Sequence, residues 1–218
     1  MKIAIIGGTG SIGVGLSLRL AAASYNVIVG SRNESKAREK AEEYTSILRN
    51  FNCDANIEYA ENFKASKICD VAILAVPAKH VFSTAESLRD ELRGKIVISP
   101  AVPMKREKEF FVYDPPPEGS AAERIASILD DSRVISAFHT VPAKKFADMN
   151  SKFNWDVPVC GDHEDAKNVV LEIVNSIDGL RALDAGPLSS SRLVEGITPL
   201  LINLAMRNDM HNLSIKFV

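Results

Sequence analysis

The chain has 218 residues, of which 46% are hydrophobic and 25% charged, a composition typical of one large globular domain or a domain with a smaller partner. Its 26 basic and 28 acidic residues give a formal net charge of -2, which disfavours binding to nucleic acid or to an anionic membrane surface. The three cysteines form no CxxC pair, which favours reduced thiols in the cytoplasm over disulfides or a zinc site, and we expect no metal. No apolar run reaches the roughly 20 residues of a membrane-spanning helix.

Short β-branched runs alternate with amphipathic stretches along the first two thirds of the chain, a pattern typical of a parallel sheet flanked by helices. The predicted strands are residues 2–6, 26–29, 57–60, 71–76, 95–99 and 134–138. The predicted helices include residues 34–48, 81–92 and 121–129. Right-handed crossovers then predict an α/β fold with a doubly wound parallel sheet, whose ligand crevice lies at the carboxyl ends of the strands.

A second set of elements follows an irregular stretch at residues 140–156. It consists of a strand at 157–161, a helix at 164–177, a strand at 180–185 and a long apolar helix after Pro187. We predict a nucleotide-binding domain of residues 1–145 and a smaller carboxyl-terminal α/β lobe of residues 146–218. The alternative is that the later strands pair with the edge of the first sheet. Residues 114–119 are predicted to be an exposed, proline-rich loop before a helix that Ser120 caps.

The first predicted strand runs into a glycine-rich turn, Gly7-Gly8-Thr9-Gly10-Ser11-Ile12-Gly13, which opens an apolar helix. Gly8, Gly10 and Gly13 form the pattern G-x-G-x-x-G in the context that a dinucleotide site requires. Glycine permits the tight turn and lets a pyrophosphate approach the main chain, while amide groups at the helix start point at the anion. The alternative is a glycine-rich turn without a ligand.

The second predicted strand ends in Gly30-Ser31-Arg32, at the position where an NAD site carries an acidic residue for the ribose hydroxyls. Ser31, Arg32 and Lys36 instead offer a hydroxyl, a guanidinium and an ammonium around one point, a set suited to a dianionic 2′-phosphate. The alternative is that Ser31 caps the next helix with Glu34, and that the two cations are solvated. The pattern favours NADP as the cofactor.

Two later segments are predicted to lie on the crevice side of the sheet. In the first, we expect Val76, Pro77 and His80 to contact the nucleotide, because Pro77 packs against a ring or ribose without an unpaired donor. His80 is as compatible with an ordinary histidine at a helix start. The second, residues 99–103, follows the fifth strand. His139 follows the sixth strand and is a candidate proton donor, with a structural histidine as the alternative. The absence of hydrolytic and metal-binding signatures favours a reductase.

Several longer motifs extend the pattern over the chain: GGTGSIG at 7–13, VGSR at 29–32 with Lys36, FHTVPA at 138–143, FNWDVPVCGD at 153–162, DGLRALDAGPLSSSRLVEGITPLL at 178–201, and the final IKFV. Together they resemble the archaeal coenzyme F420-dependent NADP oxidoreductases. The resemblance implies a Rossmann NAD(P)-binding fold and hydride exchange between carbon 4 of nicotinamide and carbon 5 of an 8-hydroxy-5-deazaflavin, coenzyme F420. It also implies an apolar deazaflavin cleft between the two predicted parts of the chain.

Site residues follow from the resemblance by position. It implies that the pyrophosphate is held by Thr9, Gly10, Ser11 and Ile12, and the 2′-phosphate by Ser31, Arg32 and Lys36. It implies that the remaining nucleotide contacts come from Pro77, His80, Val102 and Ala137, and the contacts to the deazaflavin edge from His139, Thr140 and Ser189. The helix at 193–206 is expected to wall the cleft, to form the interface of a homodimer, or both. Ala78 and Ser190 depart from the family pattern, which has a bulky aromatic residue and an amide there.

Two other functions stay open at this point. An NADPH-dependent imine or ketone reductase, resembling pyrroline carboxylate reductases, would need a proton donor near the nicotinamide ring. A non-catalytic NADP-sensing protein would need no second site at all. In each case the expected partners are small molecules, with no nucleic acid and no membrane.

Overall fold

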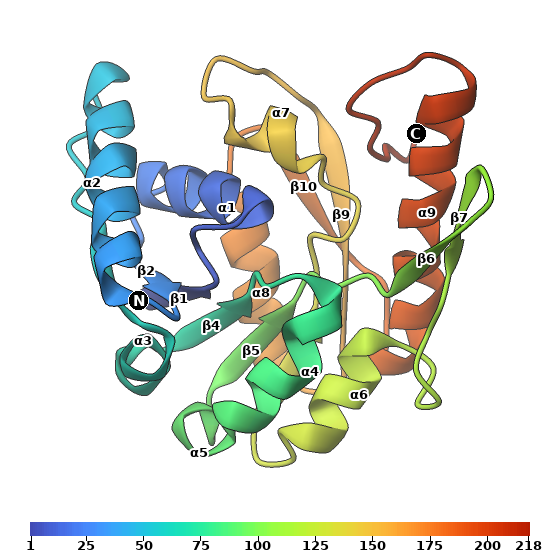
Figure 1. Cartoon of the computed structure of the whole chain (residues 1–218), viewed down its shortest axis with the longest axis horizontal. Helices are drawn as coiled ribbons and strands as arrows, with labels where there is room; N and C mark the ends of the chain where they lie inside the picture. The colour runs from blue at the N-terminus through green and yellow to red at the C-terminus, as the bar shows by residue number, and fades with distance from the viewer.

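The computed structural model describes all 218 residues, and its central feature is a mostly parallel sheet with helices on both faces (Figure 1). The eight strands lie in the order β10-β9-β8-β5-β4-β1-β2-β3. Their bounds are β1 (Lys2–Ile6), β2 (Asn26–Ser31), β3 (Glu58–Glu61), β4 (Val71–Leu74), β5 (Ile96–Ser99), β8 (Arg133–Ser136), β9 (Trp155–Gly161) and β10 (Leu180–Asp184). All neighbours are parallel except β8 and β9.

The helices divide between the two faces of this sheet. They are α1 (Ser11–Ala22), α2 (Glu34–Asn50), α3 (Asn62–Ile68), α4 (Ala78–Ser87), α5 (Arg89–Leu92), α6 (Ala121–Ile128), α7 (Ala143–Ala147), α8 (Glu164–Asn175) and α9 (Ser191–Arg207), the last preceded by the 3-10 turn η1 (Leu188–Ser190). Alternate strand residues such as Ile3 and Ile5 pack with α1, α2, α7 and α8. Their neighbours Ala4 and Ile6 pack with α3, α4, α5 and α6. No helix is long and apolar enough to span a bilayer.

The predicted α/β fold is confirmed, and the strand order β3-β2-β1-β4-β5-β8 is that of a doubly wound sheet. Several predicted bounds differ from the observed ones, and three of the differences have a clear local cause. The strand predicted at 134–138 ends at Ser136, because Phe138 has a φ of 69°, in the left-handed region that no strand accommodates. The strand predicted at 71–76 ends at Leu74, because the Ala75 N–H turns back to the Ile73 carbonyl at 3.0 Å. The helix predicted at 81–92 breaks at Leu88 into α4 and α5.

The later strands lie on the edge of the same sheet. β9 pairs antiparallel with β8, where Ile135 lies opposite Gly161, and β10 continues parallel to β9. Strands from both sides of the predicted boundary at residue 145 therefore belong to one sheet, which agrees with the alternative considered from the sequence. A separate carboxyl-terminal lobe over residues 146–218 stays a prediction.

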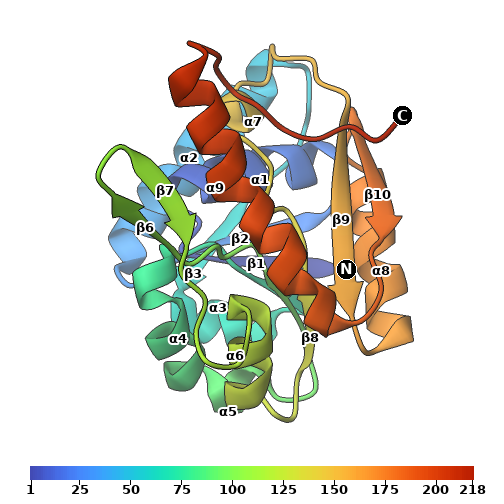
Figure 2. The ribbon, with the colours of Figure 1, turned by 90° about the vertical axis from the view of Figure 1, so that its right-hand side faces the viewer.

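A β-hairpin that was not predicted from the sequence packs on α9. It consists of β6 (Met104–Glu107) and β7 (Phe110–Tyr113), joined by a tight turn in which Lys108 has a φ of 54°. The Asn203 amide of α9 receives the Phe111 N–H at 2.8 Å and donates to the Phe111 carbonyl at 2.7 Å, so the helix side chain completes the edge of the hairpin. Figure 2 shows the hairpin beside α9. The proline-rich loop then leads to α6, which Ser120 caps as predicted.

Candidate functional site: two cavities at the carboxyl edge of the sheet

The glycine-rich turn joins β1 to α1 and is bound to two strands. The Gly8 N–H donates to the carbonyls of Ile5 and Gly30, both at 2.9 Å. A Cβ on Gly13 would lie 2.7 Å from the Gly8 Cα, so only glycine lets the helix pack directly on the turn. Helix α1 has no side-chain cap and no acidic residue in its first turn. Its first N–H groups are therefore available to an anion.

Two side chains that the sequence did not reveal support this turn. The Tyr44 hydroxyl of α2 donates to the Gly8 carbonyl at 3.2 Å, and burial raises the pKa of Tyr44 to about 12, so the donor stays protonated. At the start of α3, Asn62 Oδ1 accepts the Gly7 N–H at 3.3 Å. The sequence did contain a signal for Asn62: the polar pair Glu61-Asn62 directly follows a predicted strand, which is typical of a helix start.

A cavity of about 580 Å³, here called the glycine-turn cavity, extends from the turn to α4. Eight of the predicted residues line it: Thr9, Gly10, Ser31, Arg32, Lys36, Val76, Pro77 and His80. Asn62 lines it as well, while Gly8, Ser11, Ile12 and Gly13 lie in the adjoining turn and the first turn of α1. The tertiary structure thus brings together the ends of β1, β2 and β4.

Helix α2 is capped by a different residue from the one considered in the sequence. Asn33 Oδ1 accepts the Lys36 N–H at 3.2 Å, so the alternative in which Ser31 caps this helix was wrong. Ser31 Oγ accepts only the Asn33 N–H, at 3.3 Å, from its place at the end of β2. Because Asn33 takes the capping role, the Ser31 hydroxyl is free to donate into the cavity.

The charges around Ser31 are predominantly positive. Arg32 and Lys36 are exposed at the cavity wall, and neither forms an ion pair. Glu34, the acidic residue between them in sequence, pairs instead with Lys64 at 3.2 Å. Glu61 is the one carboxylate among the lining residues. An excess of unpaired cations at this wall favours a bound dianion.

The second cavity, here called the His139 cavity, has a volume of about 710 Å³. One wall is the segment 139–144, which follows β8 and begins α7. A second wall is one face of α9, formed by Thr198, Leu201, Ile202, Ala205 and Met206 at helical spacing. Residues 209–213, which follow α9, close a third side. The cavity therefore combines a polar wall with a largely apolar one.

Two buried polar atoms in the polar wall have no partner within the protein. His139 is 6% exposed; its Nε2 lies 3.3 Å from Ser136 Oγ, while its Nδ1 forms no hydrogen bond. Thr140 Oγ1 is also buried and unpaired. Burial lowers the pKa of His139 to about 4, so the ring is neutral at neutral pH. Both residues line the cavity, so their side chains are candidates for contacts with a ligand there.

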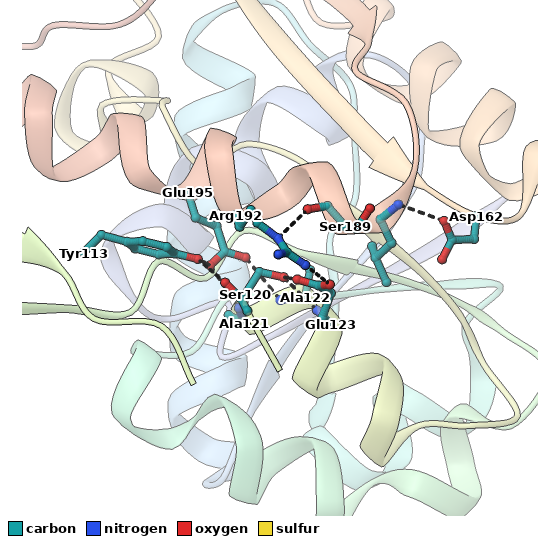
Figure 3. A network of polar contacts seen from close by, with 11 residues as sticks. Tyr113, Ser120, Ala121, Ala122, Glu123, Asp162, Ser189, Arg192 and Glu195 are labelled. Carbon is teal, nitrogen blue, oxygen red and sulfur yellow. Dashed lines mark hydrogen bonds and ion pairs between the residues drawn. The ribbon is translucent and has the colours of Figure 1, made fainter. Parts of the chain in front are cut away.

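Besides the four residues of the turn and of the start of α1, three predicted residues line neither cavity. Val102, after β5, and Ala137, after β8, are buried, and the Ala137 N–H donates to the Ser99 carbonyl at 3.2 Å. Ser189 is exposed in η1, and its carbonyl accepts from Arg192 Nε at 2.9 Å (Figure 3). The structure therefore brings their backbone segments near the crevice side without placing their side chains on a cavity wall.

The three cysteines are free thiols. Burial raises the pKa of Cys160 to about 11 and raises that of Cys69 as well, so both are protonated at neutral pH and behave as core residues. No group of three His, Cys, Asp or Glu side chains is arranged to hold a metal ion.

The fold and the glycine-turn cavity define a doubly wound dinucleotide-binding protein, and comparison with known proteins places it further. The family model described as "NADP oxidoreductase coenzyme F420-dependent" matches residues 2–103. The chain is 44% identical to the F420-dependent NADP reductase of Methanocaldococcus jannaschii, over 95% of this chain and 93% of the relative. It is 39% identical to the F420-dependent NADP reductase of Methanothermobacter marburgensis, over 99% and 97%. The chain belongs to the F420-dependent NADP oxidoreductase family.

A solved structure supports the same fold. The crystal structure of a protein from Arthrobacter sp. FB24 matches 100% of this chain and 99% of its own with a TM-score of 0.83. At 21% sequence identity, this similarity shows the shared fold.

Proposed function

We propose that this chain is an enzyme that transfers a hydride between reduced coenzyme F420, an 8-hydroxy-5-deazaflavin, and NADP+. The observation that carries the proposal is the presence of two distinct cavities, one suited to a phosphorylated dinucleotide and one to a second, largely apolar ligand. Relatives at 39% to 44% identity over nearly the whole chain are F420-dependent NADP reductases.

The glycine-turn cavity fits NADP. The uncapped start of α1 offers N–H donors to a pyrophosphate. Ser31 stands where an acidic residue would repel a 2′-phosphate, and Arg32 and Lys36 are free of ion pairs beside it. Pro77 and His80 line the opposite wall, where they face the rest of the nucleotide.

The His139 cavity fits a planar deazaflavin. Its α9 wall is apolar, and the unpaired His139 Nδ1 and Thr140 Oγ1 suit the polar edge of the ring. A deazaflavin beside a nicotinamide supplies direct hydride exchange, for which alignment and water exclusion contribute roughly 7 to 11 kcal/mol without an ionised side chain. Because His139 is neutral at neutral pH, we assign it a binding role and not that of a proton donor.

The two alternative functions fit the structure less well. An imine or ketone reductase would need an acid beside the nicotinamide. Because burial lowers the pKa of His139, this residue is neutral at neutral pH and lacks the second ring proton that an imidazolium acid would give up. An NADP sensor would have no use for a second cavity of about 710 Å³.

An absorbance experiment tests the proposed function. The purified protein is mixed with NADPH and the oxidised deazaflavin, and the decay of the deazaflavin band at about 420 nm is followed. We expect decay that depends on both substrates. No decay, combined with turnover of a cyclic imine by the same sample, would contradict the proposal.

We further propose that the enzyme is a homodimer in the cytoplasm. A second apolar stripe of α9, facing away from the His139 cavity, exposes Leu193 by 73%, Leu200 by 55% and Leu204 by 41%. Exposed apolar surface of this kind is typical of a subunit interface. The three free thiols fit a reducing compartment.

A further inference from the structure

The carboxyl-terminal tail, residues 208–218, crosses from the end of α9 to β9. Figure 2 shows it leaving the far end of α9 and running to the strands β9 and β10. On the way, residues 209–213 form one side of the His139 cavity. The position of this side of the cavity therefore depends on what holds the tail in place.

The tail is held by one buried carboxylate. Asp156, in β9, is fully buried and accepts the Phe217 N–H at 2.6 Å and the Lys216 ammonium at 2.9 Å. Arg181 of β10 donates to both Asp156 oxygens, at 2.8 and 2.7 Å, and its guanidinium also donates to the Phe217 carbonyl at 2.7 Å. The Asp156 N–H donates to the Ile215 carbonyl at 2.9 Å. The residues 215–217 are thus fixed by charge-assisted hydrogen bonds, which are the strong class.

Few other hydrogen bonds fix the tail. The Met210 N–H donates to the Ala205 carbonyl at 2.9 Å, and residues 211–214 form no hydrogen bond with the rest of the chain. Leu213 and Ile215 are half-buried, whereas the side chain of Phe217 is 53% exposed and that of Val218 is fully exposed, so apolar burial does not hold the last two residues. Hydrogen bonds therefore hold the segment that closes the cavity only at its two ends, at the last turn of α9 and at Asp156.

We propose that Asp156 is a positioning residue for the hydride partner: by anchoring residues 215–217, it holds residues 209–213 against the deazaflavin in the His139 cavity. This inference rests on the proposed function. Asp156 touches neither cavity, and the glycine-turn cavity contains no residue of the tail. Loosening the anchor should therefore weaken binding of the deazaflavin and leave binding of NADP unchanged.

A matched pair of variants at Phe217 tests the anchor. Phe217→Pro removes the N–H that Asp156 accepts, whereas Phe217→Ala removes the same exposed ring and keeps the N–H. Asp156 stays paired with Arg181 in both, so both should fold. We expect Phe217→Pro to raise the KM for the deazaflavin at least about fivefold, the order expected for a lost charge-assisted hydrogen bond, with the KM for NADPH unchanged. Phe217→Ala should resemble the wild-type protein in both constants.

Hydrogen exchange of the amides in residues 210–216, which both variants retain, tests the anchoring separately from the positioning role. We expect faster exchange in Phe217→Pro than in Phe217→Ala, because the released tail opens more often. Equal exchange would contradict the anchoring. Faster exchange with an unchanged deazaflavin KM, or an equal rise in both KM values, would overturn the positioning role. Absence of deazaflavin turnover by the wild-type protein would contradict the proposed function instead, while the exchange result still decides whether Asp156 anchors the tail.

A second pair of variants changes the carboxylate itself. Asp156→Asn should repeat the selective rise in the deazaflavin KM. Asp130→Asn, which weakens the bidentate contact of Arg89 at 2.7 Å on a segment outside both cavities, should leave both KM values unchanged. The same rise in both variants would contradict the inference.

Discussion

Arg32 and Lys36 stand at the wall of the glycine-turn cavity with no carboxylate to neutralise them. Two contacts of neighbouring side chains leave this wall free to bind an anion. Asn33 caps α2 and so frees Ser31, while Glu34 turns to Lys64. The proposed preference for NADP over NAD therefore depends on the Asn33 cap and on the ion pair between Glu34 and Lys64.

Arg32→Ala should weaken binding of NADP by about 1 to 3 kcal/mol, the range for lost charged hydrogen bonds, and leave binding of NAD nearly unchanged. Calorimetric titration with each nucleotide measures both effects. Arg38→Ala is the matched control, because Arg38 is an exposed arginine of α2 outside the cavity. Equal losses for both nucleotides would contradict the assigned role.

His139 should make the stability of the protein depend on pH. Burial lowers the pKa of its ring from 6.5 to about 4. Between these two pH values, the His139 ring is protonated in the unfolded chain and neutral in the folded protein. The free energy of unfolding should therefore fall as the pH drops from 6.5 toward 4. His139→Gln should flatten this part of the profile, measured by urea unfolding at several pH values. An unchanged slope in the variant would show that other groups cause the dependence.

At the scale of elements, α9 presents three faces with different surroundings. One face lines the His139 cavity, and a second exposes Leu200 and Leu204. From a third, the buried carboxylate of Glu195 accepts the N–H groups of Ala121 at 2.9 Å and Ala122 at 3.2 Å, and the Tyr113 hydroxyl at 2.8 Å (Figure 3). An anion at the start of α6 is favourable, so this contact offsets the burial that raises the pKa of Glu195.

Two glycine-to-alanine changes should affect helix stability in opposite directions. At Gly196 in α9, a Cβ would meet only the Tyr113 ring at 3.9 Å, so Gly196→Ala should stabilise the protein by about 0.5 to 1 kcal/mol. At Gly13 in α1, a Cβ would meet Gly8 backbone atoms at 2.7 to 2.8 Å, so Gly13→Ala should destabilise it by about 1 to 3 kcal/mol. Denaturant unfolding of both variants provides the comparison. Changes of the same sign would contradict the packing argument.

At the scale of the whole molecule, the two cavities are built from segments that are distant in sequence. The glycine-turn cavity gathers the ends of β1, β2, β3 and β4, and the His139 cavity joins the segment after β8 to α9 and the tail. The outer stripe of α9 then lies directly behind a cavity wall, so dimerisation through that stripe would stiffen the wall.

Leu200→Glu should shift the proposed dimer to monomer, because a charge would lose its hydration in an apolar interface. Sedimentation velocity of the variant and the wild-type protein measures the change. Ile68→Glu is the control, since Ile68 at the end of α3 is similarly exposed, at 51%, on another part of the surface. A wild-type protein that sediments as a monomer at micromolar concentration would refute the proposed dimer.

The predicted features that the structure confirms have local causes. The G-x-G-x-x-G turn and the Ser120 cap each lie within a few residues, so backbone angles and helix periodicity reveal them directly. Ser31, Arg32 and Lys36 line one cavity, and their binding of a phosphate stays a prediction. Local errors arose where two neighbouring residues could play the same role. Ser31 was considered as the cap of α2, and Asn33 caps it instead. The hairpin was not predicted, and its outer edge is completed by Asn203, which lies 92 residues from Phe111 in the sequence.

The amino-acid sequence alone was enough to predict the α/β class, six strands of the main sheet, the dinucleotide turn and the resemblance to the family. The folded structure was needed to show that β9 and β10 extend the first sheet, that Asn62 supports Gly7 from 55 residues away, and that Asp156 holds Phe217 from 61 residues away. These contacts join residues that are far apart in the sequence. Such residues can form hydrogen bonds only after the sheet has brought them together and buried them. Composition and residue spacing therefore do not show which polar residues will become partners.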